Sequence, residues 1–135
     1  MTFTNKFLFF LIIFSIIQAK QVFVKSGTGL KGVSHQMKLK GMKQGCLFMS
    51  ACVIGGLGSD KEIMAARKWA VQNKYIRDSD TYVNMDARIL AQKISKKFKT
   101  NYHANWKFKK GSRHWWVVNE KGVEIFNSAG LGYHK

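Results

Sequence analysis

The chain has 135 residues, of which 46% are hydrophobic, and it carries a formal net charge of +16. This length predicts a single domain. The charge favours anionic surroundings such as cell-wall polymer, anionic lipid or nucleic acid, although a solvated lysine-rich surface explains it as well. No nucleic-acid-binding motif is recognisable, so we expect no specific nucleic-acid partner.

The first nineteen residues have the pattern of a secretory signal peptide. Lys6 is their only charge, residues 7–17 are apolar except for Ser15, and Ala19 is a small residue at their end. This apolar run is too short for a comfortable membrane span. We therefore expect residues 1–19 to be a signal peptide or an uncleaved N-terminal anchor. Residues 20–135 would then form one secreted or cell-envelope domain.

Residues 20–43 contain few regular signals. Residues 21–25 predict a short strand, and the glycines after them mark turns. His35 and Gln36 have no periodic partner, so we expect both side chains at the surface.

Residues 46–54 form a nearly continuous apolar run, which is compatible with a buried helix or a buried strand. Gly45 precedes the run and Gly55 and Gly56 follow it, as at a helix that ends in glycine. We favour a central buried helix.

Two further helices are expected. Residues 59–62 read Ser-Asp-Lys-Glu, a capping box that predicts a helix from Asp60 to about Asn73. Asn84 can cap the next helix, whose apolar face follows helical spacing at Ala87, Leu90, Ala91, Ile94 and Phe98.

From residue 101 the hydrophobic period changes to two. Residues 102–109 alternate apolar and polar side chains and predict a half-buried strand. Two β-rich runs, 113–118 and 123–126, flank a polar turn that ends in Gly122, which predicts a hairpin. Helices followed by an antiparallel meander indicate an α+β domain.

The hairpin brings a histidine towards an asparagine. If Asn119 pairs with Gly122, His114 lies directly opposite Asn127, and an imidazole and an amide at that separation can share a hydrogen bond. If Gly122 instead forms a left-handed bulge, the pairing moves by one residue and His114 faces Ser128. A polar partner is within reach of His114 in both registers.

Cys46 is the candidate nucleophile for this histidine. On the first turn of a helix its sulfur would face unpaired backbone N–H groups and the positive end of the dipole, which favour a thiolate. Those N–H groups, helped by the amide of Gln44, could stabilise an oxyanion. If residues 46–54 are helical, Cys46 and Cys52 are separated by a rise of about 9 Å and cannot form a disulfide. If they are a loop, a small disulfide ring is possible and the catalytic interpretation fails. As a core hydrophobe, Cys52 needs no catalytic explanation.

The sequence resembles the papain-like cysteine peptidase superfamily, and within it small bacterial domains of the bacteriocin-leader-processing type (peptidase C39-like). The resemblance rests on Gln44-Gly45-Cys46 opening an apolar helix, on His114-Trp115-Trp116-Val117-Val118, and on Val123–Asn127 closing the next strand. It implies a papain-like fold with N-terminal helices packed on a C-terminal antiparallel β-meander. It also implies Cys46 as nucleophile, His114 as general base and acid, Asn127 as the orienting residue, and no metal or cofactor.

The function expected from these patterns is an exported thiol hydrolase that cleaves a peptide or amide bond of a peptide or protein substrate. The basic surface slightly favours an anionic cell-wall or membrane-associated target, and we expect a monomer. The alternative is a non-catalytic basic binding module on a papain-like fold, which would bind an anionic polymer or a protein partner.

Overall fold

The structure is a computed structural model that describes residues 18–135. The segment expected to be a signal peptide or anchor therefore lies outside the described residues, except for Gln18 and Ala19. Within the described part, no helix is long and apolar enough to cross a membrane.

Within residues 18–135, three helices are followed along the chain by a three-stranded sheet. A 3₁₀ turn, η1 (Gln36–Lys38), precedes α2 (Cys46–Ile54), α3 (Asp60–Gln72) and α4 (Ala87–Phe98). The strands β1 (Lys107–Lys110), β2 (Trp115–Val118) and β3 (Glu124–Phe126) form an antiparallel sheet in the order β1-β2-β3. The domain is α+β, as its sequence predicts.

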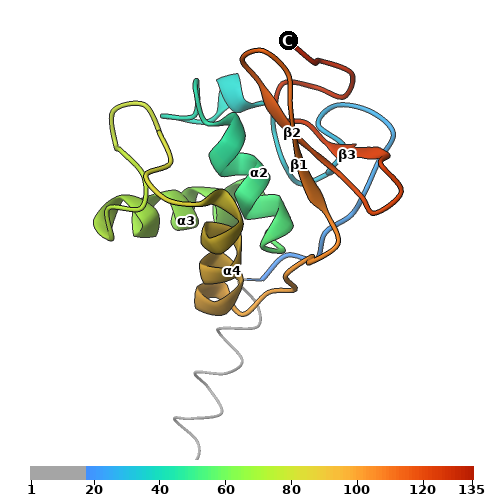
Figure 1. The fold of residues 1–135 in the computed structure, drawn as a ribbon. Coiled ribbons are helices and arrows are strands. Elements are labelled where there is room, and N and C mark those ends of the chain that lie inside the picture. Colours follow the sequence, from blue (N-terminus) through green and yellow to red (C-terminus); the bar gives the residue numbers. More distant parts are fainter. Residues whose placement is uncertain (1–17) are drawn as a thin grey trace, which may run out of the picture.

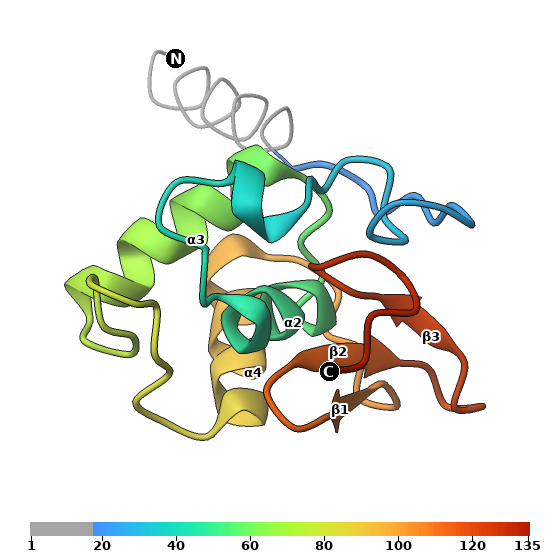
Figure 2. The ribbon, with the colours of Figure 1, turned by 90° about the horizontal axis from the view of Figure 1, so that it is seen from above.

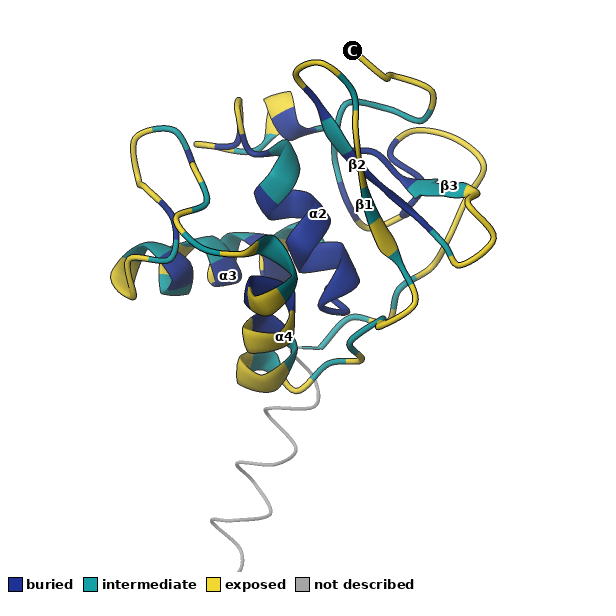
Figure 3. Cartoon of the chain, in the orientation of Figure 1, coloured by how far each residue is buried: buried dark blue, intermediate teal, exposed yellow. Residues whose placement is uncertain are grey.

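Helix α2 is the centre of the fold. It contacts α4, α3 and β2, and Figures 1 and 2 show it between the other two helices and the sheet. Most of its residues are completely buried, which Figure 3 shows as dark blue along almost the whole helix. An apolar run without a polar face suits this position, because every side of the helix meets protein. The buried-helix prediction for residues 46–54 is confirmed.

Glycines fix the two ends of α2. A Cβ on Gly45 would lie 2.8 Å from Met42 Sδ, so a side chain in the turn before Cys46 would require the Met42 side chain to move. At the other end Gly56 has φ +99°, and a Cβ there would lie 2.4 Å from the Asn101 carbonyl oxygen. These close approaches explain why the apolar run is bounded by glycine.

The two surface helices begin at side-chain caps. Ser59 Oγ accepts a hydrogen bond from Glu62 N (3.2 Å), and Glu62 Oε1 accepts from Gly58 N (3.0 Å) and Ser59 Oγ (3.1 Å). The predicted helix start at Asp60, with Ser59 as its cap, is confirmed. The expected cap of α4 at Asn84 is wrong. Asp86 is the N-cap, and its carboxylate accepts from Arg88 N and Ile89 N, because a carboxylate near the first turn also complements the helix dipole.

The strand predicted at residues 102–109 is shorter in the structure. Only residues 107–110 pair with β2, whereas residues 102–106 form no strand. His103 N donates to the carbonyl of Ile54 (2.8 Å) at the end of α2, and the His103 ring stacks on Trp106 with centroids 3.5 Å apart. The backbone at His103 thus bonds to the last residue of α2 and not to a neighbouring strand. The alternation of apolar and polar side chains in residues 102–106 therefore does not indicate a strand. The strand expected at residues 21–25 is likewise reduced to one isolated bridge, Phe23 with Leu30.

The pairing of β2 with β3 differs from the register in which Asn119 pairs with Gly122 and His114 lies directly opposite Asn127. Gly122 has φ +79° and Asn119 N bonds to Val123 O, as in the bulged alternative. A further irregularity follows, because Val118 pairs with Glu124 but Val117 pairs with Phe126. Ile125 is thus an extra residue on β3, and neither predicted partner of His114 lies opposite it in the ladder.

Candidate active site

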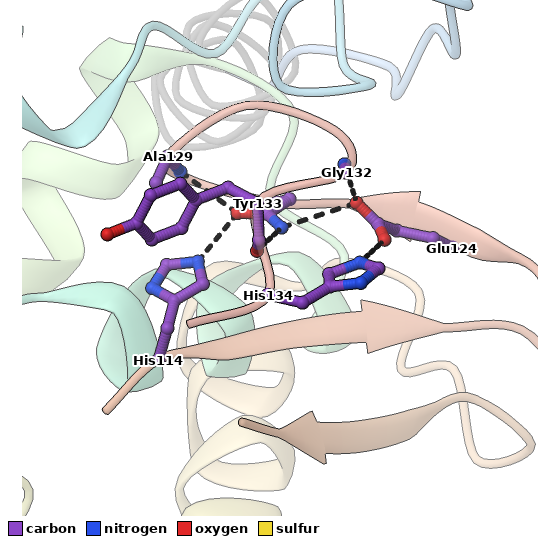
Figure 4. A network of polar contacts seen from close by, with 7 residues as sticks. His114, Glu124, Ala129, Gly132, Tyr133 and His134 are labelled. Carbon is purple, nitrogen blue, oxygen red and sulfur yellow. Dashed lines mark hydrogen bonds and ion pairs between the residues drawn. The ribbon is translucent and has the colours of Figure 1, made fainter. Parts of the chain in front are cut away.

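His114 and Asn127 meet just beyond the ends of the two paired strands. His114 immediately precedes β2 and Asn127 immediately follows β3. His114 Nε2 lies 2.6 Å from Asn127 Oδ1, and both side chains are buried (Figure 4). The predicted hydrogen bond is therefore present, although the register expected to produce it is not.

The surrounding hydrogen bonds determine which imidazole nitrogen carries the proton. Asn127 Nδ2 donates to the backbone carbonyl of Tyr133 (2.7 Å), an atom that can only accept. The amide oxygen must then be the atom that faces His114 and accepts from Ala129 N (3.1 Å). Because an amide oxygen only accepts, His114 Nε2 is protonated, and in the neutral ring Nδ1 keeps a free lone pair.

Glu124 binds the amide nitrogen of Asn127. Its Oε2 accepts hydrogen bonds from Asn127 Nδ2 (3.2 Å) and Gly132 N (2.7 Å), and its Oε1 pairs with His134 (Figure 4). The segment after Asn127 is thereby tied to β3 at several points. The result is a continuous polar chain from His134 through Glu124 and Asn127 to His114.

Aromatic rings enclose the same histidine. Trp116 stacks between His114 and His134, with ring centroids 6.1 Å and 4.3 Å away, and Tyr133 meets His114 edge to face at 5.2 Å. Trp116 is buried, whereas its neighbour Trp115 is half-buried. These rings restrict rotation of the imidazole and keep bulk water away from its bond to Asn127.

Cys46 and His114 line one open groove of about 1100 Å³. Cys46 is the first residue of α2 and half-buried, at the helix end where unpaired N–H groups and the dipole favour negative charge. No hydrogen bond joins Cys46 to His114 among the described residues. The two groups therefore share a groove without being in direct hydrogen-bonding contact.

Two glutamines line this groove, and only one is held in place. Gln44, predicted as the oxyanion donor, is exposed. Gln36 is buried, which corrects the expectation that it lies at the surface. Its Nε2 donates to Lys43 O (2.7 Å), and its Oε1 accepts from Ser128 Oγ (2.5 Å). His35 also lines the groove, half-buried at the N-cap of η1.

The second cysteine has a different environment. Cys52 is fully buried in α2, and both thiols are free, as helical geometry requires. Burial raises the pKa of the Cys52 thiol well above its ordinary value, and the nearby negative charge of Glu62 adds to this effect. A thiol that is buried and kept protonated is a poor nucleophile, so Cys46 is the candidate for chemistry.

Comparisons with known proteins do not assign the site. No protein-family model, curated protein or solved structure matches the chain. Within residues 18–135, no group of three or more His, Cys, Asp or Glu side chains is arranged to hold a metal ion. The described residues form an α+β domain in which a cysteine and a histidine line one groove and an asparagine bonds to that histidine.

Proposed function

We propose that the chain is an exported thiol hydrolase of the papain-like type, which cleaves a peptide or amide bond. The observation that carries this proposal is the buried His114–Asn127 hydrogen bond, which leaves Nδ1 free in a ring that lines the same groove as Cys46. An imidazole held in one tautomer beside a thiol is the arrangement that nucleophilic acyl transfer needs. Export is proposed from the signal-like pattern of residues 1–19.

The proposed reaction proceeds through a thioester. His114 Nδ1 takes the Cys46 proton as the sulfur attacks the carbonyl carbon of the substrate. The C–N bond breaks when the imidazolium returns that proton to the leaving amine. Water, deprotonated by His114, then attacks the thioester, releases the carboxylic acid and restores the thiol. The proposed reaction requires that the Cys46–His114 contact forms when substrate binds.

Oxyanion stabilisation needs a donor that is fixed before the reaction. The backbone N–H groups at the start of α2 meet this requirement. Gln36 meets it better than Gln44, because its amide is anchored at both ends and Nε2 uses one of its two N–H bonds for Lys43 O. We therefore propose Gln36 as the side-chain oxyanion donor, in place of the residue expected from sequence.

Acetylation by p-nitrophenyl acetate, mapped by peptide mass spectrometry, tests the proposal. We expect the folded protein to acquire one acetyl group on Cys46 faster than the same cysteine does in the unfolded chain, with release of p-nitrophenol. Cys52 should remain unmodified, because it is completely buried. Acetylation of Cys46 no faster than in the unfolded protein would overturn the hydrolase proposal.

The second candidate is a non-catalytic basic binding module. It is favoured by the net charge of +16 and by the absence of a Cys46–His114 hydrogen bond among the described residues. This candidate predicts no enhanced acetylation of Cys46, together with binding of an anionic polymer that weakens steeply as salt is added. The same acetylation experiment therefore separates the two functions.

A further inference from the structure

The groove that contains Cys46 is lined by cationic side chains and by no Asp or Glu side chain. Lys43, Arg113 and Lys135 belong to its lining, and none of the seven acidic residues of the chain does. The acidic side chains have other roles. Asp86 caps α4, Glu62 accepts from Gly58 N before α3, and Glu124 binds Asn127. The groove is therefore a region of positive potential.

Among the described residues, these three cationic side chains form no ion pair with an Asp or Glu side chain. The ion pairs among the described residues are Arg67 with Asp78, Arg77 with Asp80, and Glu124 with His134. Lys43, Arg113 and Lys135 take part in none of them. An anion that enters the groove would therefore displace no ion pair formed by these three side chains.

A second, independent source of positive potential lies at the same place. The N-cap of α2 is Gly45, which has no side chain to cap the helix. The first helical hydrogen bond runs from Met49 N to Gly45 O. The preceding N–H groups of the first turn, beginning at Cys46, have no partner within the helix. Cationic side chains and a helix N-terminus therefore converge on one groove.

We propose that this groove selects a peptide substrate with a carboxylate next to the scissile bond. This inference rests on the proposed thiol hydrolase and specifies its substrate class. Arg113 can bind a carboxylate through two parallel N–H bonds, whereas the lysines act as point charges. Exposed ion pairs are individually weak, so we expect the three cations together to favour an anionic over a neutral substrate by about ten-fold at low salt.

Two alkylating reagents of nearly equal size test the charge preference. Iodoacetate and iodoacetamide both lose iodide to the Cys46 sulfur, but only iodoacetate carries a carboxylate. We expect the ratio of the iodoacetate rate to the iodoacetamide rate to be about ten-fold higher in the folded than in the unfolded protein. Added salt should lower this ratio, because it screens exposed charges.

A matched pair of triple variants locates the effect. Replacing Lys43, Arg113 and Lys135 by Gln should bring the ratio close to its value in the unfolded chain. Replacing Lys68, Lys96 and Lys97 by Gln removes the same formal charge from exposed positions outside the groove and should leave the ratio high. Equal ratios in the two variants would show that net charge, and not the groove, is responsible, and would overturn the proposal.

Peptide protection identifies the source of the carboxylate. An oligoglutamate blocked at both ends should protect Cys46 from iodoacetamide better than its oligoglutamine counterpart. A third peptide, an oligoglutamine with a free α-carboxylate, is compared with the blocked oligoglutamate. Equal protection by these two would show that the groove binds the carboxylate at a chain end, which also supports a carboxylate substrate. Equal protection by both blocked peptides, or stronger protection by oligothymidylate, would overturn the proposal. Failure of the hydrolase itself is seen separately, as slow acetylation of Cys46, and leaves these ratios measurable.

Discussion

Replacing His114 by Ala should lower the rate at which p-nitrophenyl acetate acetylates Cys46 near neutral pH by about 10²–10⁴-fold, the usual contribution of a positioned acid–base group. The reason is that the free Nδ1 of His114 is the proton acceptor proposed for the thiol. The domain should stay folded. Asn127 Oδ1 still accepts from Ala129 N in the variant, so the stability cost should be near 1 kcal/mol.

His103→Ala is the matched control for this substitution. His103 is half-buried and, like His114, it stacks on a tryptophan, but it does not line the groove that contains Cys46. We expect its acetylation rate at Cys46 to equal that of the unchanged protein. A folded His114→Ala protein that acetylates Cys46 at the normal rate would remove His114 from the mechanism.

Asn127→Ala should have the largest effect on stability, a loss of about 2–4 kcal/mol in the free energy of unfolding. The Asn127 side chain is completely buried and bonds to His114, Glu124, Ala129 N and Tyr133 O. Its removal leaves several of these groups without partners and frees the imidazole to rotate. Acetylation of Cys46 should therefore also slow, though less than in His114→Ala.

Urea denaturation of Asn127→Ala and Asn119→Ala makes this comparison. Asn119 lies in the same hairpin, and its side chain accepts only from Lys121 N and Val123 N at the exposed turn. We expect it to cost about 1 kcal/mol or less and to leave acetylation unchanged. Equal stability of the two variants would contradict the central role assigned to Asn127.

The helical half of the fold follows from local sequence signals. The apolar run between Gly45 and Gly55 predicts α2 with its observed bounds, and Ser59 with Glu62 predicts the start of α3. These features are readable because both the cap and the helix it serves lie within a few residues of each other. The error at α4 is of the same kind, since Asn84 and Asp86 are both good caps and only the structure distinguishes them.

The sheet was harder to predict because its geometry depends on distant contacts. The alternation at residues 102–106 resembles a strand, but His103 bonds to the end of α2, far away in sequence. The extra residue Ile125 shifts the register by an amount that no local pattern reveals. His114 and Asn127 still meet, because both lie beyond the paired residues and their side chains span the remaining distance.

Some residues of the candidate site have local sequence signals, whereas one depends on a distant contact. Cys46, His114 and Asn127 are identifiable from residue type, order and the hairpin between the last two. Gln36 is not identifiable in this way, because the hydrogen bond that fixes its amide oxygen comes from Ser128, a residue 92 positions later in the chain. The only available signal was a glutamine upstream of the cysteine. Closeness to Cys46 in the sequence favours Gln44, whereas the hydrogen bonds of the folded chain favour Gln36.

The pH dependence of Cys46 alkylation by iodoacetamide in the folded protein tests whether His114 activates this cysteine. An unfolded cysteine titrates near 8.5, so its alkylation rate should fall about 75-fold between about pH 8 and about pH 6. If His114 activates Cys46, we predict a shallower fall over the same interval than in the unfolded chain, with Cys52 protected throughout. A fall as steep as in the unfolded chain would contradict the proposed thiol mechanism.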